Sequence, residues 1–249
     1  MALDGRTALV TGASSGIGEA VVRELAAAGA DVALLARREE RLRSIADELR
    51  EEYDCHTHVR AADVRDEATV EAAVEEVVDA FGGLDVVVSN AGLGRGAGVA
   101  DLDTEAYDAM VGTNVDGCFY LARAALPHLR ASAGNLVFVG SFAGQYPRPA
   151  NPVYAATKWW VRGFALSLQA READRVERPG DAVAVSTVNP TEVRTEFGGQ
   201  DGEPFAERFE PGEALEPAEV AAAVVFTAQQ ERAVVPEVDV HRRDKFKGW

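Results

Sequence analysis

Cysteine is scarce in this sequence, which contains only Cys55 and Cys118 among its 249 residues. Two cysteines are too few for the disulfide framework that stabilises a small secreted domain. The chain also lacks any apolar run of about 18 residues, so no membrane-spanning helix is expected. A basic-then-apolar leader is absent as well, because a strand-like pattern begins by Arg6. These absences favour a reduced, cytoplasmic protein without a secretory signal.

Lysine is also rare: Lys158, Lys245 and Lys247 are the only lysines among 25 Lys and Arg residues. Asp and Glu total 41, so the formal net charge is −16. A surface this acidic argues against nucleic acid or an anionic membrane as a partner. The excess of acid favours adaptation to high salt. The alternative is a GC-rich genome, in which Arg codons replace Lys codons.

What the chain does contain is a regular alternation of strand-like and helix-like segments. Its length and its 47% hydrophobic content suit one large α/β domain. Apolar runs alternate with segments of helical spacing, which predicts repeated βα units and a parallel sheet in a single domain over residues 1–249. The expected strands span residues 7–11, 32–36, 59–62, 84–88, 135–139, 183–188 and 234–240. The expected helices begin with an apolar stripe from Ile17 to Ala28 and continue near residues 39–53, 66–81, 104–130 (with interruptions), 151–171 and 219–229.

A glycine-rich loop, TGASSGIG at residues 11–18, lies between the first expected strand and the first helix. Gly12 permits a tight turn, Gly16 lets the backbone approach a pyrophosphate, and Gly18 lets the helix pack close to the sheet. The free N–H groups of the helix N-terminus would then face the phosphates. A glycine loop in this βαβ context predicts a dinucleotide site.

Tyr154 and Lys158 stand four residues apart, so on one helix they share a face. A phenol titrates near ~10 and exchanges protons poorly at neutral pH, but a cation about 4–6 Å away lowers the pKa of a phenol by roughly 1–3 units. The pair therefore predicts a general acid/base.

These motifs occur in an order that resembles the short-chain dehydrogenase/reductase family, and the match covers nearly the whole chain. The resemblance implies a doubly wound Rossmann sheet of seven mainly parallel strands with helices on both faces. It also implies a nicotinamide cofactor and hydride transfer between an alcohol and a carbonyl. The matching motifs are the loop at residues 11–18, Asn90-Ala91-Gly92, Asn114, Ser141, Tyr154 with Lys158, and Asn189-Pro190.

The resemblance gives four residues catalytic roles. Tyr154 would be the acid/base, Lys158 would support it and hold the nicotinamide ribose, and Ser141 would hydrogen-bond the substrate oxygen. Asn114 would hold a water in a proton relay behind Lys158. Taken singly, Ser141 also suits the start of a turn, and Asn114 suits a helix cap.

The end of the second strand favours NADP(H) over NAD(H). An acid at this position binds the ribose 2′-hydroxyl of NAD, but here Ala36 occupies it and Arg37 and Arg38 follow. Arg37 would fork onto the 2′-phosphate, with Arg38 or Ser14 assisting. The alternative is that both arginines pair with the acidic helix that follows. The full set of expected cofactor contacts is Gly12, Ser14, Ser15, Gly16, Ile17, Gly18, Arg37, Arg38, Asp63, Val64, Asn90, Ala91, Gly92, Tyr154, Lys158, Pro190, Val193 and Thr195.

Residues 190–216 are rich in Gly, Pro and acid and show no sustained period apart from a short helix near 205–209. Such a loop at the carboxyl edge of a sheet predicts a substrate lid; the alternative is a disordered surface loop. Substrate contacts are expected from Ser141, Gln145 and Tyr154. The sequence departs from the family where Thr191 and Glu192 follow Pro190, since a Gly is usual there.

The sequence thus predicts an NADP-dependent enzyme acting on a small alcohol or carbonyl, as a homotetramer or homodimer. Trp160 would anchor the subunit interface or fill the core of one subunit. The segment around Tyr146 and the one around Glu196 loosely resemble the 3-hydroxy acid dehydrogenase branch. The alternatives are a 3-oxoacyl carrier-protein reductase and a catalytically silent NADP-binding sensor. No metal site is expected, because His56 and His58 lack a third ligand at convincing spacing.

Overall fold

The computed structural model describes residues 2–178, 180–199 and 203–247 of the chain. Within these ranges one sheet has the strand order β3-β2-β1-β4-β5-β6-β7, and every pairing is parallel. The predicted seven-stranded, mainly parallel sheet is confirmed. The strands are β1 (Thr7–Thr11), β2 (Asp31–Ala36), β3 (Thr57–Ala61), β4 (Val86–Ser89), β5 (Asn135–Val139), β6 (Ala184–Pro190) and β7 (Glu237–Val240).

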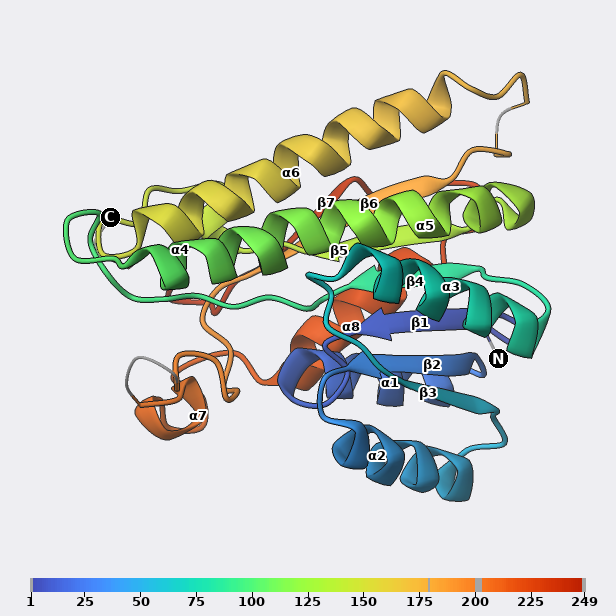
Figure 1. The fold of residues 1–249 in the computed structure, drawn as a ribbon, viewed down its shortest axis with the longest axis horizontal. Helices are drawn as coiled ribbons and strands as arrows, with labels where there is room; N and C mark the ends of the chain where they lie inside the picture. Colours follow the sequence, from blue (N-terminus) through green and yellow to red (C-terminus); the bar gives the residue numbers. More distant parts are fainter. Residues whose placement is uncertain (1, 179, 200–202, 248–249) are drawn as a thin grey trace.

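Helices cover both faces of the sheet, as Figure 1 shows, which confirms the doubly wound architecture. Each face has its own core cluster: along β5, Val137 belongs to one cluster and Phe138 to the other. A strand buried on both faces has a continuous run of apolar residues, so the middle strands could be predicted from the sequence. One cluster includes α1 (Gly16–Ala27), α2 (Glu39–Glu52) and α8 (Pro217–Ala228), and the other includes α3 (Glu67–Phe81), α5 (Gly117–Ser132) and α6 (Pro152–Ala173).

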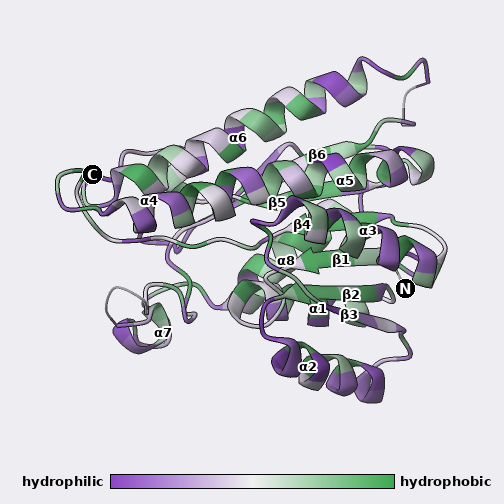
Figure 2. Cartoon of the chain, viewed as in Figure 1, coloured by the Kyte–Doolittle hydropathy of each residue, from purple (hydrophilic) through white to green (hydrophobic). Residues whose placement is uncertain are grey.

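Hydropathy follows the same layering, since the strands are largely hydrophobic and the outer surface of α2 is hydrophilic (Figure 2). Local signals set several helix ends. Asp66 caps α3 by accepting from the Thr69 N–H at 3.0 Å. Gly82, with φ of +81°, ends the same helix in the left-handed region that glycine adopts without strain. No helix in the described part of the chain is long and apolar enough to cross a membrane.

The expected interrupted helix near 104–130 consists of three pieces. α4 (Thr104–Val111) leads into a π-helical turn (Gly112–Asp116), and α5 follows directly. Single π turns inside helices often occur at functional sites. Here the π turn contains Asn114, whose side chain is buried.

Several strand boundaries differ from the expected ones by two or three residues. The clearest case is β7, expected from residue 234 but beginning at Glu237, directly after Pro236. Proline has no N–H to donate to a sheet ladder, so the strand begins after it. The Pro236 carbonyl still accepts from the Thr187 N–H at 2.8 Å.

The sequence order of the strands reverses between β1 and β4, and ligands of open α/β sheets bind at such a switch point. The segment after β6 leaves the sheet at the edge formed by the carboxyl ends of the strands. It includes the short helix α7 (Phe205–Arg208), which lies apart from the sheet in Figure 1. The helix expected near 205–209 is thus confirmed. Residues 200–202 of the predicted lid lie outside the described residues.

Candidate active site

A cleft of about 940 Å³ opens at the carboxyl edge of the sheet. Ligand pockets of this kind are usually roughly 300–1,000 Å³, so the cleft is large enough for an extended ligand. Its walls come from the ends of six strands, β1 to β6, and from the segment after β6. The predicted site residues that line it are Gly12, Ser14, Ser15, Gly16, Ile17, Arg37, Arg38, Asp63, Val64, Asn90, Ala91, Gly92, Ser141, Tyr154, Lys158, Pro190, Val193 and Thr195.

The glycine loop is folded tightly against the end of β4. Gly12 has φ of +67°, and a Cβ there would lie 2.8 Å from Asn90 Nδ2, so a larger residue would strain the turn. The same amide donates to the Thr11 carbonyl at 2.9 Å. Gly18 lies outside the cleft lining and packs instead against the Gly12 carbonyl, as its predicted role in helix–sheet packing requires. The loop therefore leaves the N-terminus of α1 open to the cleft, which suits a pyrophosphate.

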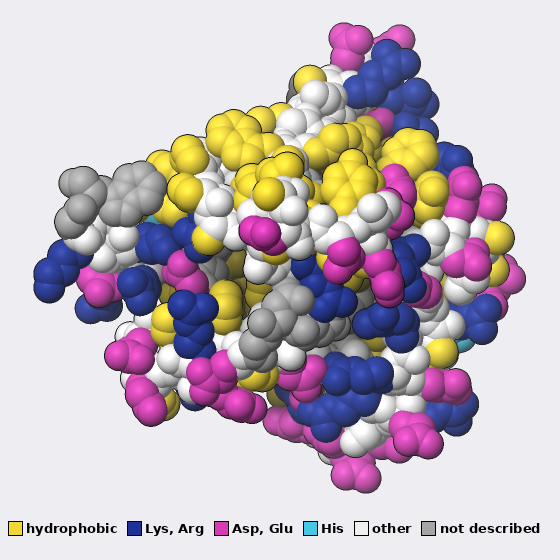
Figure 3. All heavy atoms as spheres, turned by 60° about the vertical axis from the view of Figure 1, so that its left-hand side comes forward, with side chains coloured by type: hydrophobic (Ala, Val, Ile, Leu, Met, Phe, Trp, Pro, Cys, Tyr) yellow, Lys and Arg dark blue, Asp and Glu magenta, His cyan; other side chains and the backbone are white. Residues whose placement is uncertain are grey.

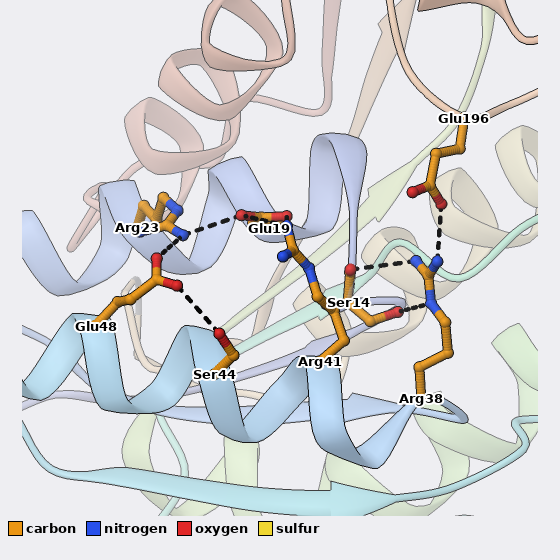
Figure 4. A network of polar contacts seen from close by, with 8 residues as sticks. All are labelled: Ser14, Glu19, Arg23, Arg38, Arg41, Ser44, Glu48 and Glu196. Atoms are coloured by element: carbon orange, nitrogen blue, oxygen red, sulfur yellow. Dashed lines mark hydrogen bonds and ion pairs between the residues drawn. The ribbon is translucent and has the colours of Figure 1, made fainter.

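Arg38 binds across the mouth of the cleft and not to the helix that follows it. Its Nε donates to Ser14 Oγ at 3.1 Å, and a guanidinium nitrogen donates to the Ser14 carbonyl at 3.2 Å. A further nitrogen pairs with Glu196 Oε2 at 3.0 Å, as Figure 4 shows. The alternative that this arginine serves only the acidic helix is wrong for Arg38.

Arg37 is exposed and lines the cleft beside Asp63. Hydrogen bonds from Arg65 hold the pKa of the Asp63 carboxyl below its usual value although burial opposes them, and the Arg37 charge acts in the same direction. This wall therefore combines an ionised carboxylate with exposed guanidinium groups. Such a set could contact both the polar adenosine part and a 2′-phosphate of a dinucleotide.

Lys158 is buried, with 6% of its surface exposed, beside Tyr154 on α6. Its ammonium donates to the Val139 carbonyl at 2.9 Å and lies 5.9 Å from the centroid of the Tyr154 ring. Asn151 caps the helix by accepting from the Tyr154 N–H at 3.3 Å, which fixes where the phenol enters the cleft. The structure thus brings the predicted phenol and cation together.

Ser141 and Asn114 both hold backbone around the pair. Ser141 Oγ accepts from the Ala143 N–H at 3.1 Å and begins a short 3₁₀ turn, so the turn alternative describes its geometry while its hydroxyl hydrogen stays available to donate. Asn114 accepts from the Leu93 N–H and donates to the Leu93 carbonyl, at 2.9 and 2.8 Å. It also donates to Thr157 Oγ1 at 3.0 Å. Asn114 therefore ties the segment after β4 to α6; its water relay stays a prediction.

Gln145 was expected to contact the substrate but does not line the cleft. Its Nε2 donates to Asp239 Oδ1 at 2.8 Å, on β7. A sequence of this length gives no sign of that pairing, because the two residues are 94 positions apart. The substrate contact predicted for Gln145 has no support in this geometry.

The cleft is also lined by residues that were absent from the predicted set, among them Arg148, Glu192 and Phe197. The Phe197 ring lies 5.7 Å from the Tyr154 ring, centroid to centroid, so the segment after β6 covers the phenol with an apolar side chain. One sequence feature indicated that Glu192 belongs to the site: it is a charged residue, unusual for the family, beside the expected nicotinamide site.

Comparisons with known proteins show the family to which this chain is similar. The family model for short chain dehydrogenase matches residues 6–204. An NADP-dependent 3-hydroxy acid dehydrogenase of Salmonella typhimurium is 35% identical, over 88% of this chain and 88% of that protein. An alcohol dehydrogenase of the archaeon Thermococcus sibiricus, complexed with 5-hydroxy-NADP, has a TM-score of 0.88 at 30% identity and covers 98% of this chain and 99% of its own. A 3-ketoacyl-(acyl-carrier-protein) reductase of Brucella melitensis, complexed with NADH, has a TM-score of 0.84 at 29% identity, over 97% and 98% of the two chains.

Proposed function

Since this chain belongs to the short chain dehydrogenase family of oxidoreductases, we propose that it transfers a hydride between NADP(H) and an alcohol or carbonyl substrate, with Tyr154 as the general acid/base. The observation that carries this proposal is the placement of Tyr154, Lys158 and Ser141 in one cleft with the glycine loop. Chemistry and cofactor binding would then occur within one continuous cavity.

Tyr154, Lys158 and Ser141 would each have a separate role in the reduction of the carbonyl. NADPH, when bound, supplies the hydride that a carbonyl carbon accepts. The Tyr154 phenol gives its proton to the carbonyl oxygen, and the nearby Lys158 ammonium stabilises the phenolate that remains. Ser141 donates a hydrogen bond to the same oxygen. In the opposite direction, the phenolate removes the hydroxyl proton of an alcohol.

The preference for NADP(H) rests on the residues after β2. Ala36 offers no carboxylate to a ribose 2′-hydroxyl, whereas Arg37 and Arg38 line the cleft with guanidinium groups. Solved relatives carry either NADP-type or NADH cofactors, so the family alone leaves the choice to these side chains. The glycine loop and the 940 Å³ cleft fit a dinucleotide of either kind.

The two alternative functions are less well supported. A silent NADP-binding sensor would have no need of the assembled Ser141, Tyr154 and Lys158. A carrier-protein reductase needs a largely basic surface to grip an acidic partner, but the cleft lining mixes both signs, with Glu105, Asp108 and Glu196 as well as Arg65, Arg95 and Arg148. A small-molecule substrate agrees better with this mixed charge.

We propose further that the chain self-associates through α5 and α6. Phe119 and Trp159 on these helices are 41% and 47% exposed, and Figure 3 shows hydrophobic side chains gathered over the upper part of the molecule. Trp160 instead stacks on Phe164 of its own helix, with ring centroids 4.7 Å apart, which favours its core-filling role. The free thiols Cys55 and Cys118 agree with the cytoplasm as location.

The decisive experiment is a panel of ketones, 3-oxo acids, sugars and aldehydes assayed with NADPH and with NADH by cofactor absorbance. We expect oxidation of NADPH with at least one carbonyl and much slower oxidation of NADH. If no member of the panel is reduced with either cofactor, the proposed activity is wrong.

A further inference from the structure

Three charged side chains from distant parts of the chain meet at the end of the cleft beyond Ser141. Glu192 follows β6, Arg148 lies between β5 and α6, and Lys245 lies after β7. The Lys245 ammonium contacts both carboxylate oxygens of Glu192, at 2.7 and 2.8 Å. Arg148 contacts only Glu192 Oε1, at 3.3 Å. We call these three residues the Glu192 cluster.

The Glu192 cluster is built on the turn that begins at Ser141. The Lys245 ammonium lies 4.6 Å from the centroid of the Phe142 ring, and the Arg148 guanidinium lies 5.8 Å from the same centroid. The side chains of Lys245 and Glu192 are 9% and 16% exposed, whereas Arg148 is 38% exposed. Lys245 is therefore a largely buried support, while Arg148 and Glu192 line the cleft and Arg148 is the more exposed of the two.

The two cations hold Glu192 unequally. Burial of the Glu192 carboxyl opposes its ionisation, but the Lys245 hydrogen bond and the charges of Lys245 and Arg148 outweigh burial, so its pKa lies below the usual value. Lys245 alone provides the two shorter contacts to the carboxylate. The cluster has one positive charge in excess, and the weaker contact leaves that charge on Arg148.

We propose that Arg148 binds an oxyanion carried by the substrate, a carboxylate or a sulfonate, and that Lys245 keeps Glu192 from occupying Arg148. This inference rests on the proposed reduction of a carbonyl held by Ser141 and Tyr154. Arg148 lines the same cleft as these two residues, so one substrate would present its carbonyl to Tyr154 and its anion to Arg148.

The charge of the whole protein makes such a local cation necessary for an anionic substrate. At a net charge of −16, the long-range field repels anions from the cleft. A guanidinium fork matches an oxyanion with two parallel hydrogen bonds, and such charge-assisted bonds are among the strongest available. Arg148 would exchange its single 3.3 Å contact with Glu192 for this pairing.

The test compares a 3-oxo acid with its methyl ester, because both present the same carbonyl and only the acid carries the anion. Wild-type protein should show a higher kcat/KM for the acid with NADPH. Arg148→Gln should lower the acid-to-ester ratio of kcat/KM about 10- to 150-fold, the range of a charge-assisted hydrogen bond. Arg148→Lys should recover part of that loss.

The other two members of the cluster should act in opposite directions. Glu192→Gln frees Arg148 from its competitor and should raise the acid-to-ester ratio. Lys245→Met lets Glu192 pair fully with Arg148 and should lower the ratio. Lys247→Met is the matched control, because Lys247 is exposed and two positions further along the chain, and it should leave the ratio unchanged.

Binding provides a second measurement that does not need turnover. Calorimetry with NADP-loaded protein should show tighter binding of a 3-hydroxy carboxylate than of its amide, and Arg148→Gln should abolish the difference. Equal binding of the two ligands by wild-type protein would overturn the inference. A fall in acid and ester kcat/KM by the same factor in Arg148→Gln would also overturn it. Failure of the proposed function would differ, because no carbonyl of either kind would be reduced.

Discussion

The two ends of the cleft use positive charge in opposite ways. At the end near β2, Arg38 and its partner Glu196 have side chains that are 50% and 66% exposed. Near β5, Lys158 is 6% exposed and the Lys245 side chain 9%, and both have short contacts to fixed partners. Exposed ion pairs contribute roughly 0–1 kcal/mol and exchange easily, whereas breaking a buried pair costs about 3–5 kcal/mol.

This difference matches the task expected at each end. A cofactor must enter and leave, and arginines that exchange one weak partner for a phosphate permit that. Proton transfer needs a phenol and a cation whose positions do not change between turnovers, and buried lysines provide such positions. The contrast predicts that variants at the β5 end affect chemistry or folding, whereas variants at the β2 end affect the choice of cofactor.

The largest effect should come from Tyr154→Phe, which should impair only the function of the cleft end near β5. Loss of the general acid should reduce kcat by about 10²- to 10⁴-fold, because the variant keeps Lys158 but lacks the phenol hydroxyl. The dissociation constant for NADPH, measured by fluorescence titration, should change little. Near-normal turnover would show that another group transfers the proton.

Arg37→Ala should impair only cofactor binding at the cleft end near β2. Loss of one charge-assisted hydrogen bond costs roughly 1.5–3 kcal/mol, which is about a 10- to 150-fold loss of kcat/KM with NADPH. The value with NADH should stay close to that of the wild type. Comparison of the two cofactors in both proteins checks the prediction, and equal use of NADPH by the mutant would refute the assigned contact.

A pH series should show that the Glu192–Lys245 pair stabilises the fold. The folded-state pKa of Glu192 is depressed, so its contribution is present above the unfolded value of about 4.3 and is lost as the pH falls through the folded value. Glu192→Gln should therefore be less stable than wild type at pH 7, by less than the roughly 3–5 kcal/mol of a fully buried pair because this pair is only part-buried, and the gap should narrow below about pH 4.3.

Urea unfolding at pH 7 and below pH 4.3 measures that gap. Glu207→Gln is a suitable control, because Glu207 is exposed on α7, and its difference from wild type should be small at both pH values. If the difference in unfolding free energy between wild type and Glu192→Gln grows as the pH falls, the prediction is wrong.

The smallest effect should come from Glu196→Gln, which removes the exposed partner of Arg38 at the β2 end of the cleft. Removal of an exposed partner should change the free energy of unfolding by less than about 1 kcal/mol. It also frees Arg38 for a 2′-phosphate, so NADP⁺ should bind a few-fold more tightly, by calorimetry, with little change for NAD⁺. Weaker binding of NADP⁺ would mean that Glu196 holds Arg38 in its productive position.

Local signals explain which parts of this structure the sequence predicted. β1 and β5 were placed with their observed bounds because each is a continuous apolar run between turn residues. The glycine loop and the Tyr154–Lys158 pair were predictable because their spacing is short and their chemistry is local. In contrast, the contact between Lys245 and Glu192 joins residues 53 positions apart. No periodicity reports a pairing of that kind, and Lys245 stood out only because lysine is rare.

The same reasoning explains Asn114 and Gln145. The resemblance placed Asn114 at the catalytic centre, but only the structure shows that a π turn directs its amide to the Leu93 backbone. Gln145 stands near Ser141 in sequence, yet β7 lies beside β6 and supplies Asp239 as its partner. Side-chain direction at the end of a strand depends on which neighbour the sheet places beside it.

The burial of two of the three lysines also affects how the protein would behave toward amine-directed reagents. Acylating dyes, cross-linkers and immobilisation resins react with accessible ammonium groups, and among the lysine side chains described here only Lys247 is exposed. Labelling at lysine would therefore be nearly uniform, with one modified position per chain. The acidic, arginine-rich surface around it would remain unmodified, so acylation would remove the charge of this single lysine and leave the cleft open.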